Sequence, residues 1–261
     1  MGAPKFYSIR ELSAYVIVIR GNPTSEFYYD KIAPIWEEVG VKLERFDAFT
    51  PDTMPDTLTF HRNEANKYKH LPTQSKEFSA TEKACWYSHY TLWKRCVEID
   101  KPIIIIEHDC VPFNPNQLIY SNKEWFRSYD KGAMGCYMIK PLMADFMCRI
   151  TEKDGVYSGP LGHIEYWYGQ FAGGESLVRG DRFAGPLSRR YVAACTQIMR
   201  TDVGSTIDHY SGTQAENDPR TQLKKPFPFL RLEDLPERLT LDAIQEQQFS
   251  YDYMWKSLAK K

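Results

Sequence analysis

The chain has 261 residues, 43% of them hydrophobic, which is enough for one α/β domain with a substantial buried core. Its 33 Lys and Arg nearly balance its 34 Asp and Glu, so no overall field attracts nucleic acid or an anionic membrane, although a local basic patch is compatible with this balance. The longest apolar runs are far shorter than the roughly 20 residues of a membrane-spanning helix.

The N-terminal residues carry charges and Pro4 without an apolar stretch that ends in a small-residue cleavage site. We therefore expect no secretory signal peptide and a cytoplasmic protein. The six cysteines form no C-x-x-C pair and lie mostly among apolar neighbours. This pattern predicts reduced core thiols and argues against a zinc site or a disulfide framework.

The first elements predict a βαβ unit with a parallel strand pair. Residues 14–19 form a continuous apolar, largely β-branched run, typical of a strand buried on both faces. Ser25 is the predicted N-cap of a helix that runs to about Val39, where Gly40 ends it. Residues 41–46 then alternate apolar and charged side chains, as a half-exposed strand does.

Residues 50–76 are polar, contain three prolines and several basic side chains, and show no periodicity. This predicts a long loop or insertion, for which a surface decoration and a binding loop are equally good interpretations. A helix follows from Ser79, whose spacing to Glu82 is that of a capping box, to about Ile99. Residues 103–106 are four isoleucines, which predict a strand in the middle of the sheet.

The second half of the chain gives weaker patterns. We expect a strand over residues 134–139, a helix over 141–150, a late strand within 191–199, and a charged helical tail over 232–261. Residues 155–185 are rich in glycine and aromatic side chains, which indicates irregular structure that lines a site.

The main chemical candidate is Glu107-His108-Asp109, at the end of the isoleucine strand. Open α/β sheets bind ligands at the carboxyl ends of their strands. In an extended segment Glu107 and Asp109 would point the same way, and a divalent cation would offset their repulsion while neutralising a diphosphate. Taken alone, such a pair is more often a solvated strand end. The alternation also predicts that His108 faces the opposite side of the sheet.

Three segments add a family resemblance. Glu82-Lys-Ala-Cys-Trp-Tyr-Ser-His-Tyr-Thr-Leu-Trp93 resembles the G-E-x-G-C-x-x-S-H-x-x-x-W helix of the lipopolysaccharide and procollagen type glycosyltransferases, family 25. Residues 104–111 are similar to that family's I-L-E-D-D-V strand, and residues 135–139 to its G-x-Y-x-I strand. The resemblance covers roughly residues 14–208. In this chain His108 replaces the middle acidic residue, and residues 20–25 replace the family's Asp-Arg pair.

The resemblance implies a GT-A-like, Rossmann-type α/β fold with a mostly parallel sheet flanked by helices and a helical C-terminal tail. We expect one domain, with a nucleotide-sugar half (14–140), an acceptor-side half (141–231) and the tail (232–261). The resemblance also implies transfer of a hexosyl or pentosyl group from a nucleotide diphosphosugar, for which we expect a UDP-sugar, with Mn²⁺ or Mg²⁺ as cofactor. The predicted donor-site residues are Arg20, Glu82, Ser88, His89 and Glu107, and the predicted metal ligands are Asp109, Glu107 and His209.

Removal of the acceptor proton needs a base, for which the sequence offers Glu165 first, then His163 and Asp208. Two acceptors have even weight: a glycan such as lipopolysaccharide, and hydroxymethylated cytosine in DNA, which would make the protein a phage enzyme of the host cytoplasm. The basic residues of the 62–76 segment and Lys224-Lys225 favour the DNA acceptor. The alternatives are a metal-dependent phosphotransferase or nuclease, and a non-catalytic glycan- or nucleotide-binding module.

Overall fold

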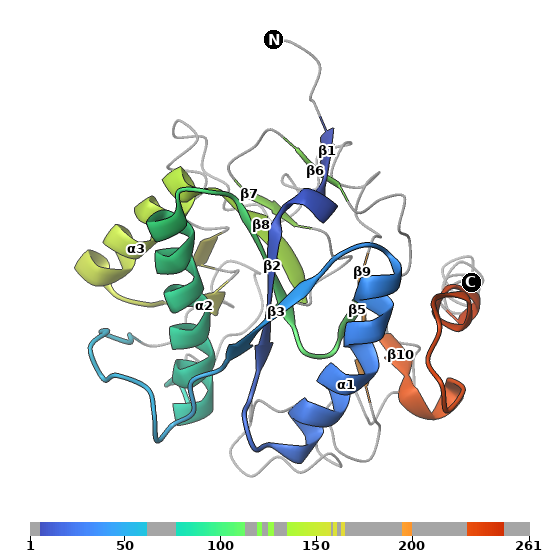
Figure 1. Cartoon of the computed structure of the whole chain (residues 1–261). Helices are drawn as coiled ribbons and strands as arrows, with labels where there is room; N and C mark the ends of the chain where they lie inside the picture. Colours follow the sequence, from blue (N-terminus) through green and yellow to red (C-terminus); the bar gives the residue numbers. More distant parts are fainter. Residues whose placement is uncertain are drawn as a thin grey trace, which may run out of the picture.

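The computed structural model describes residues 6–61, 77–112, 119–121, 125–127, 135–157, 159–160, 163–164, 195–199 and 229–247. A five-stranded sheet of order β3-β2-β4-β8-β7 forms its centre (Figure 1). The strands are β2 (Ser13–Val18), β3 (Leu43–Asp47), β4 (Ile103–Glu107), β7 (Trp125–Arg127) and β8 (Cys136–Ile139). Only β8 runs against the others, because it is antiparallel to both of its neighbours. The predicted mostly parallel sheet is therefore confirmed.

Helices cover both faces of this sheet. Helix α1 (Pro23–Glu38) lies on one face, and α2 (Ala80–Ile99) and α3 (Pro141–Asp154) lie together on the other (Figure 1). Strand β4 is central, as predicted, and its isoleucines alternate: Ile104 and Ile106 pack toward α1, and Ile103 and Ile105 toward α2 and α3. Each fully buried isoleucine contributes about 1.5–3 kcal/mol of transfer free energy, so both layers are held firmly to this strand.

The N-cap of α1 is Asn22, and the prediction of Ser25 was wrong. Asn22 Oδ1 accepts the N–H of Ser25 (3.0 Å), and Pro23 occupies the first helical turn, where its missing N–H costs nothing. Ser25 lies inside the helix, and its hydroxyl accepts the N–H of Ile19 (2.9 Å). Gly40 ends the helix as predicted, with a φ of +79° that favours glycine.

Two smaller sheets complete the described strands. β5 (Cys110–Pro112), β9 (Cys195–Met199) and β10 (Phe229–Arg231) form a sheet of order β10-β9-β5, and β1 (Phe6–Ser8) pairs with β6 (Ile119–Ser121). Two 3-10 helices, η1 (Ile9–Glu11) and η5 (Leu232–Asp234), follow β1 and β10. Strand β9 confirms part of the predicted late strand, of which residues 191–194 lie outside the described residues.

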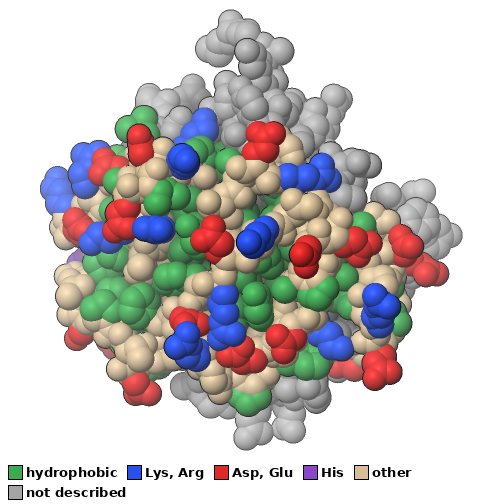
Figure 2. Space-filling view, viewed as in Figure 1, with side chains coloured by type: hydrophobic (Ala, Val, Ile, Leu, Met, Phe, Trp, Pro, Cys, Tyr) green, Lys and Arg blue, Asp and Glu red, His purple; other side chains and the backbone are tan. Residues whose placement is uncertain are grey.

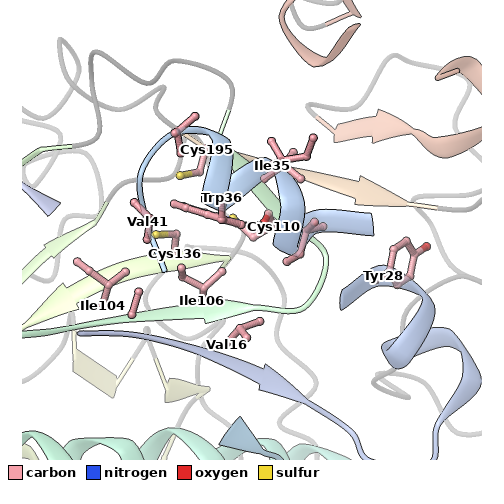
Figure 3. Close-up of a cluster of buried hydrophobic side chains, with 14 of the residues drawn as sticks. Val16, Tyr28, Ile35, Trp36, Val41, Ile104, Ile106, Cys110, Cys136 and Cys195 are labelled. Atoms are coloured by element: carbon pink, nitrogen blue, oxygen red, sulfur yellow. Dashed lines mark hydrogen bonds between the residues drawn. The ribbon is translucent and has the colours of Figure 1, made fainter. Parts of the chain in front are cut away.

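Residues 241–247 of the predicted helical tail are helical, and Ile244 packs in the core beside α1. Residues 248–261 lie outside the described part. All six cysteines are free thiols, as predicted, and Cys110, Cys136 and Cys195 gather in the α1-side core (Figure 3). Within the described residues, no helix is both long and apolar enough to span a bilayer.

Candidate active site at the carboxyl edge of the sheet

The predicted site begins where β4 turns into β5. Strand β4 ends at Glu107, and a two-residue turn leads to Cys110, the first residue of β5. The backbone is fixed on both sides of the turn, because Glu107 N donates to Gly135 O (2.8 Å) and Trp36 Nε1 donates to Cys110 O (2.8 Å; Figure 3). The expectation that Glu107 and Asp109 point the same way assumed an extended segment. That premise was wrong, because the chain turns after Glu107.

Glu107 and His108 face opposite layers. The Glu107 carboxylate lies toward α2, with Oε1 3.9 Å from His89 Nε2. The His108 ring stacks on Tyr28 of α1, with centroids 5.8 Å apart. Burial lowers the pKa of His108, which favours its neutral form. The prediction that His108 faces away from Glu107 is therefore confirmed.

His89 is almost completely enclosed. Its side chain is 1% exposed, against 20% for Glu107, and burial lowers the pKa of the imidazole to about 3. His89 Nδ1 lies 2.8 Å from the hydroxyl of Tyr137, which also accepts the indole N–H of Trp93 (3.0 Å). Sequence reasoning assigned no role to Tyr137, although it is the tyrosine of the G-x-Y-x-I segment.

The N-terminal half of α2 brings further predicted residues to this place. The Glu82 carboxylate accepts the N–H of Ser79 (2.9 Å) and so completes the predicted capping box. Burial, the charge of Glu107 and the charge of Glu82 together raise the pKa of the half-buried Cys85 thiol. The spacing of Glu82, Cys85 and His89 puts these three residues on one side of α2, from which His89 lies next to Glu107.

Ser88 and Tyr87 hold the loop that follows β3. The buried hydroxyl of Ser88 accepts the N–H of Phe49 (3.0 Å), and the Tyr87 hydroxyl accepts the N–H groups of Thr57 (2.7 Å) and Leu58 (2.6 Å). The first part of the predicted long loop is thus fastened to α2, whereas residues 62–76 lie outside the described residues. Because Ser88 is completely buried, its hydroxyl holds this loop from the interior of the protein.

Arg20 follows β2 and is exposed, with 76% of its side chain accessible. It forms an ion pair with Asp47 at the end of β3. Asp47 also pairs with Arg45 (3.0 Å), whose guanidinium makes two hydrogen bonds to the Glu26 carboxylate, at 2.7 and 2.6 Å. This network ties the ends of β2 and β3 to the start of α1.

Side chains already occupy several amides in the first βα turn. Ser25 Oγ accepts the N–H of Ile19, Glu26 Oε1 accepts that of Gly21 (3.2 Å), and Asn22 Oδ1 accepts that of Ser25. Phosphate loops of dinucleotide-binding folds instead present such amides to the ligand. This turn is therefore unlike a dinucleotide-binding phosphate loop.

The parallel strands bring these groups to one edge. Val18 of β2 pairs with Asp47 of β3, and Ile17 pairs with Glu107 of β4. Arg20, Asp47 and Glu107 accordingly lie at the carboxyl ends of adjacent strands, which is where open α/β sheets bind ligands. In the described part of the chain, however, no three His, Cys, Asp or Glu side chains converge as metal ligands. His209, the predicted third ligand, lies outside that part.

Of the three candidate bases, the structure describes only His163. It lies in the core, 1% exposed, with its ring against Trp86 at a centroid distance of 5.2 Å. Burial lowers its pKa to about 3. His163 is therefore a core residue and was a wrong candidate. Glu165 and Asp208 lie outside the described residues.

Comparison with known proteins agrees with the helix and strand motifs. No curated protein matches the chain. Residues 29–131 match the family model described as glycosyltransferase family 25 (LPS biosynthesis protein). The match contains α2, β4 and the Glu107–Asp109 turn, and this family implies glycosyltransferase activity. The predicted resemblance is thereby confirmed over this segment: residues 29–131 have the sequence pattern of glycosyltransferase family 25.

Proposed function

We propose that this protein is a metal-dependent glycosyltransferase with a GT-A-like fold, which moves a sugar from a nucleotide diphosphosugar to a hydroxyl group of a glycan. One observation carries the proposal: Glu107 ends the central parallel strand, beside the buried His89, inside the segment that matches family 25. The position suits a charged ligand, because Glu107 is partly exposed while the groups behind it are enclosed.

The chemistry of the available groups fits a hard divalent cation. Mg²⁺ and similar ions are commonly held by one or two carboxylates together with substrate phosphates and water, so the site needs few protein ligands. Glu107 and Asp109 would hold the ion, which when bound would neutralise charge on the leaving diphosphate. Since amides of the first βα turn are already bonded to side chains, we place the diphosphate at the β4 end of the sheet edge.

The nucleotide then extends toward the ends of β2 and β3. Arg20 is the most exposed charge described in that network, and its pairing with Asp47 fixes the guanidinium at the rim. We assign Arg20 and Asp47 to the nucleoside side of the donor, which we take to be a uridine diphosphosugar. In this proposal residues 14–140 hold the donor and residues 141–231 the acceptor, with Glu165 as the base that removes the acceptor proton and Asp208 as the second candidate.

A glycan is the preferred acceptor. The matching family is described by lipopolysaccharide biosynthesis, whose acceptors are sugars. On the face drawn in Figure 2, the described Lys and Arg side chains lie among Asp and Glu, whereas a DNA-binding face gathers positive charge. The basic segments that favoured a DNA acceptor, 62–76 and Lys224-Lys225, lie outside the described residues.

Titration calorimetry with UDP in the presence and absence of Mn²⁺ tests the donor site. We expect Mn²⁺ to strengthen UDP binding, and equal affinities in both conditions would contradict the proposal. A mass-spectrometric screen of nucleotide sugars against an extracted glycan and against hydroxymethylcytosine DNA then identifies the acceptor. Hydrolysis of nucleic acid without any sugar donor would instead support the phosphotransferase or nuclease class.

Asp109→Asn should abolish turnover and the effect of Mn²⁺ on UDP affinity, because the amide keeps the size of the side chain but not its charge. The thermal midpoint should change little. Asp145→Asn is the matched control, since Asp145 pairs with Arg149 on the surface of α3 (2.8 Å). An Asp109→Asn enzyme with turnover equal to that of the control would refute the metal assignment.

A further inference from the structure

Three buried side chains form a hydrogen-bonded chain behind Glu107. Trp93 and His89 lie one turn apart on α2, and Tyr137 reaches them from β8, the strand beside β4. Trp93 Nε1 is 3.0 Å and His89 Nδ1 is 2.8 Å from the Tyr137 hydroxyl, and His89 Nε2 is 3.9 Å from Glu107 Oε1. All three side chains are buried from solvent, so water does not compete for these contacts.

The direction of the hydrogen bonds follows from the donors. Indole nitrogen only donates, so the Tyr137 oxygen accepts from Trp93. The hydroxyl proton of Tyr137 then has His89 Nδ1 as its acceptor, because the described part of the chain offers it no other hydrogen-bond partner. His89 Nδ1 is therefore without a proton, and the imidazole carries its proton on Nε2, the atom that faces Glu107.

The alternative tautomer of His89, with its proton on Nδ1, is less favourable. A proton on Nδ1 would leave the buried Tyr137 hydroxyl proton without an acceptor, which costs about 1–3 kcal/mol. It would also turn the lone pair of Nε2 toward the Glu107 carboxylate, so that like partial charges face each other. A proton on Nε2 has no hydrogen-bond acceptor among the described residues either, but it faces the negative Glu107 carboxylate at 3.9 Å, which attracts it. The charge of Glu107 therefore favours the Nε2–H form, in which the Tyr137 hydroxyl also keeps its acceptor.

We propose that Tyr137 is a positioning residue of the donor site, which fixes His89 as the Nε2–H tautomer so that this N–H orients the Glu107 carboxylate. This inference rests on the proposed function, because it assumes that Glu107 contacts the cation and donor. At 3.9 Å the N–H and the carboxylate attract each other without a direct hydrogen bond, and burial of the imidazole strengthens this attraction relative to the same pair in water. The arrangement resembles the supporting contacts that orient metal-binding carboxylates in other proteins.

The first measurement needs no activity. Long-range ¹H–¹⁵N NMR of the histidine side chains should show the Nε2–H tautomer for His89, and Tyr137→Phe should shift it toward Nδ1–H. Tyr90→Phe is the matched control: it removes a tyrosine hydroxyl next to His89 on α2, but one that donates to Glu152 of α3. An Nδ1–H tautomer in the wild-type protein, or no change in Tyr137→Phe, would overturn the inference.

The second measurement is UDP affinity with Mn²⁺. Loss of supporting contacts of this kind weakens metal sites by about 10- to 100-fold. Because Tyr137 acts through His89, we expect Tyr137→Phe to weaken Mn²⁺-dependent UDP binding by about tenfold, at the lower end of that range, and Tyr90→Phe to leave it unchanged. An affinity of Tyr137→Phe equal to that of Tyr90→Phe would also overturn the inference.

A double-mutant cycle separates positioning from a general loss of packing. His89→Gln keeps an N–H donor near Nε2 that needs no tautomer to be fixed, whereas His89→Leu keeps only bulk. We expect His89→Gln to retain more Mn²⁺-dependent UDP affinity than His89→Leu, and Tyr137→Phe to cost little in the His89→Gln background. Equal losses in both backgrounds would mean that Tyr137 acts only through packing.

The two proposals fail separately. If wild-type protein shows no effect of Mn²⁺ on UDP binding, the proposed function is refuted, and the positioning role fails with it even where NMR finds the Nε2–H tautomer. If Mn²⁺ strengthens UDP binding but the tautomer is Nδ1–H, only the positioning role is refuted. Thermal melting of each variant identifies a substitution that prevents folding, in which case the His89→Gln and His89→Leu pair decides the result.

Discussion

Replacing Ser88 with Ala tests whether α2 holds the loop after β3. In the folded protein the Ser88 hydroxyl accepts the N–H of Phe49 (3.0 Å) and donates to Ala84 O (3.0 Å). The Ala84 carbonyl keeps its own helical hydrogen bond after the change. The Phe49 N–H, in contrast, loses its acceptor at a place where the neighbouring Ser88 side chain is completely buried.

The expected loss follows from these contacts. A buried donor without an acceptor costs about 1–3 kcal/mol. The higher helix propensity of alanine returns about 0.5 kcal/mol. We therefore expect Ser88→Ala to lower the free energy of unfolding by about 0.5–2.5 kcal/mol. Thr53→Ala is the matched control, because the Thr53 hydroxyl also accepts a loop N–H, that of Thr50 (2.8 Å), but is exposed. Water replaces that hydroxyl, so its loss should stay within about 0.5 kcal/mol.

Urea unfolding of both variants, followed by circular dichroism, measures the two changes. We expect a lower midpoint for Ser88→Ala with an unchanged slope, since the surface exposed on unfolding stays the same. Phe49 lies two residues after Asp47, so a loosened loop should also weaken UDP binding if the donor site is as proposed. Equal midpoints for Ser88→Ala and Thr53→Ala would refute the reasoning, because burial of the hydroxyl would then make no difference.

Two further predictions use other described contacts. Gly155→Ala should lower the free energy of unfolding in urea by about 2–5 kcal/mol, because its φ of +78° disfavours a side chain and the new Cβ would lie 2.7 Å from Thr59 O. Gly21→Ala is the control: it has a similar φ of +74° but open space around the new Cβ, and should cost about 1 kcal/mol. Equal losses in the two variants would contradict the predicted clash at Gly155. Hydrogen bonds from Arg45 and then Gly21 lower the pKa of Glu26 below its ordinary 4.5, so its contribution to stability is present above pH 4.5 and is lost as the pH falls through the folded value. Arg45→Met should raise this pKa toward 4.5 in an NMR titration, and an unchanged pKa would show that Arg45 is not its cause.

The family match covers residues 29–131. It contains the α2 helix and the Glu107–Asp109 turn, and so it bears on the donor side of the proposal. The proposed base Glu165 and the predicted ligand His209 lie beyond it. The family match therefore supports the donor side of the proposal, and the screen of donors and acceptors tests its acceptor side.

Local patterns were sufficient for most elements. The capping box at Ser79 and Glu82, the four isoleucines of β4 and the glycine after α1 each act through neighbouring residues, so the sequence alone predicted where these elements begin or end. The N-cap of α1 was missed because Asn22 and Ser25 are both good caps, and only the backbone geometry distinguishes them.

The site required the tertiary structure. The alternation of side chains along a strand correctly predicted that His108 faces away from Glu107. It could not predict the turn at Asp109, because that turn depends on hydrogen bonds from Glu107 and Trp36 to residues distant in the chain. Nor could it reveal that Tyr137 joins Trp93 and His89, since strand β8 meets α2 only after the sheet has formed. The sequence alone determined which residues and which family to consider. The tertiary structure decided which of those side chains meet, because contacts between distant residues depend on packing and not on local pattern.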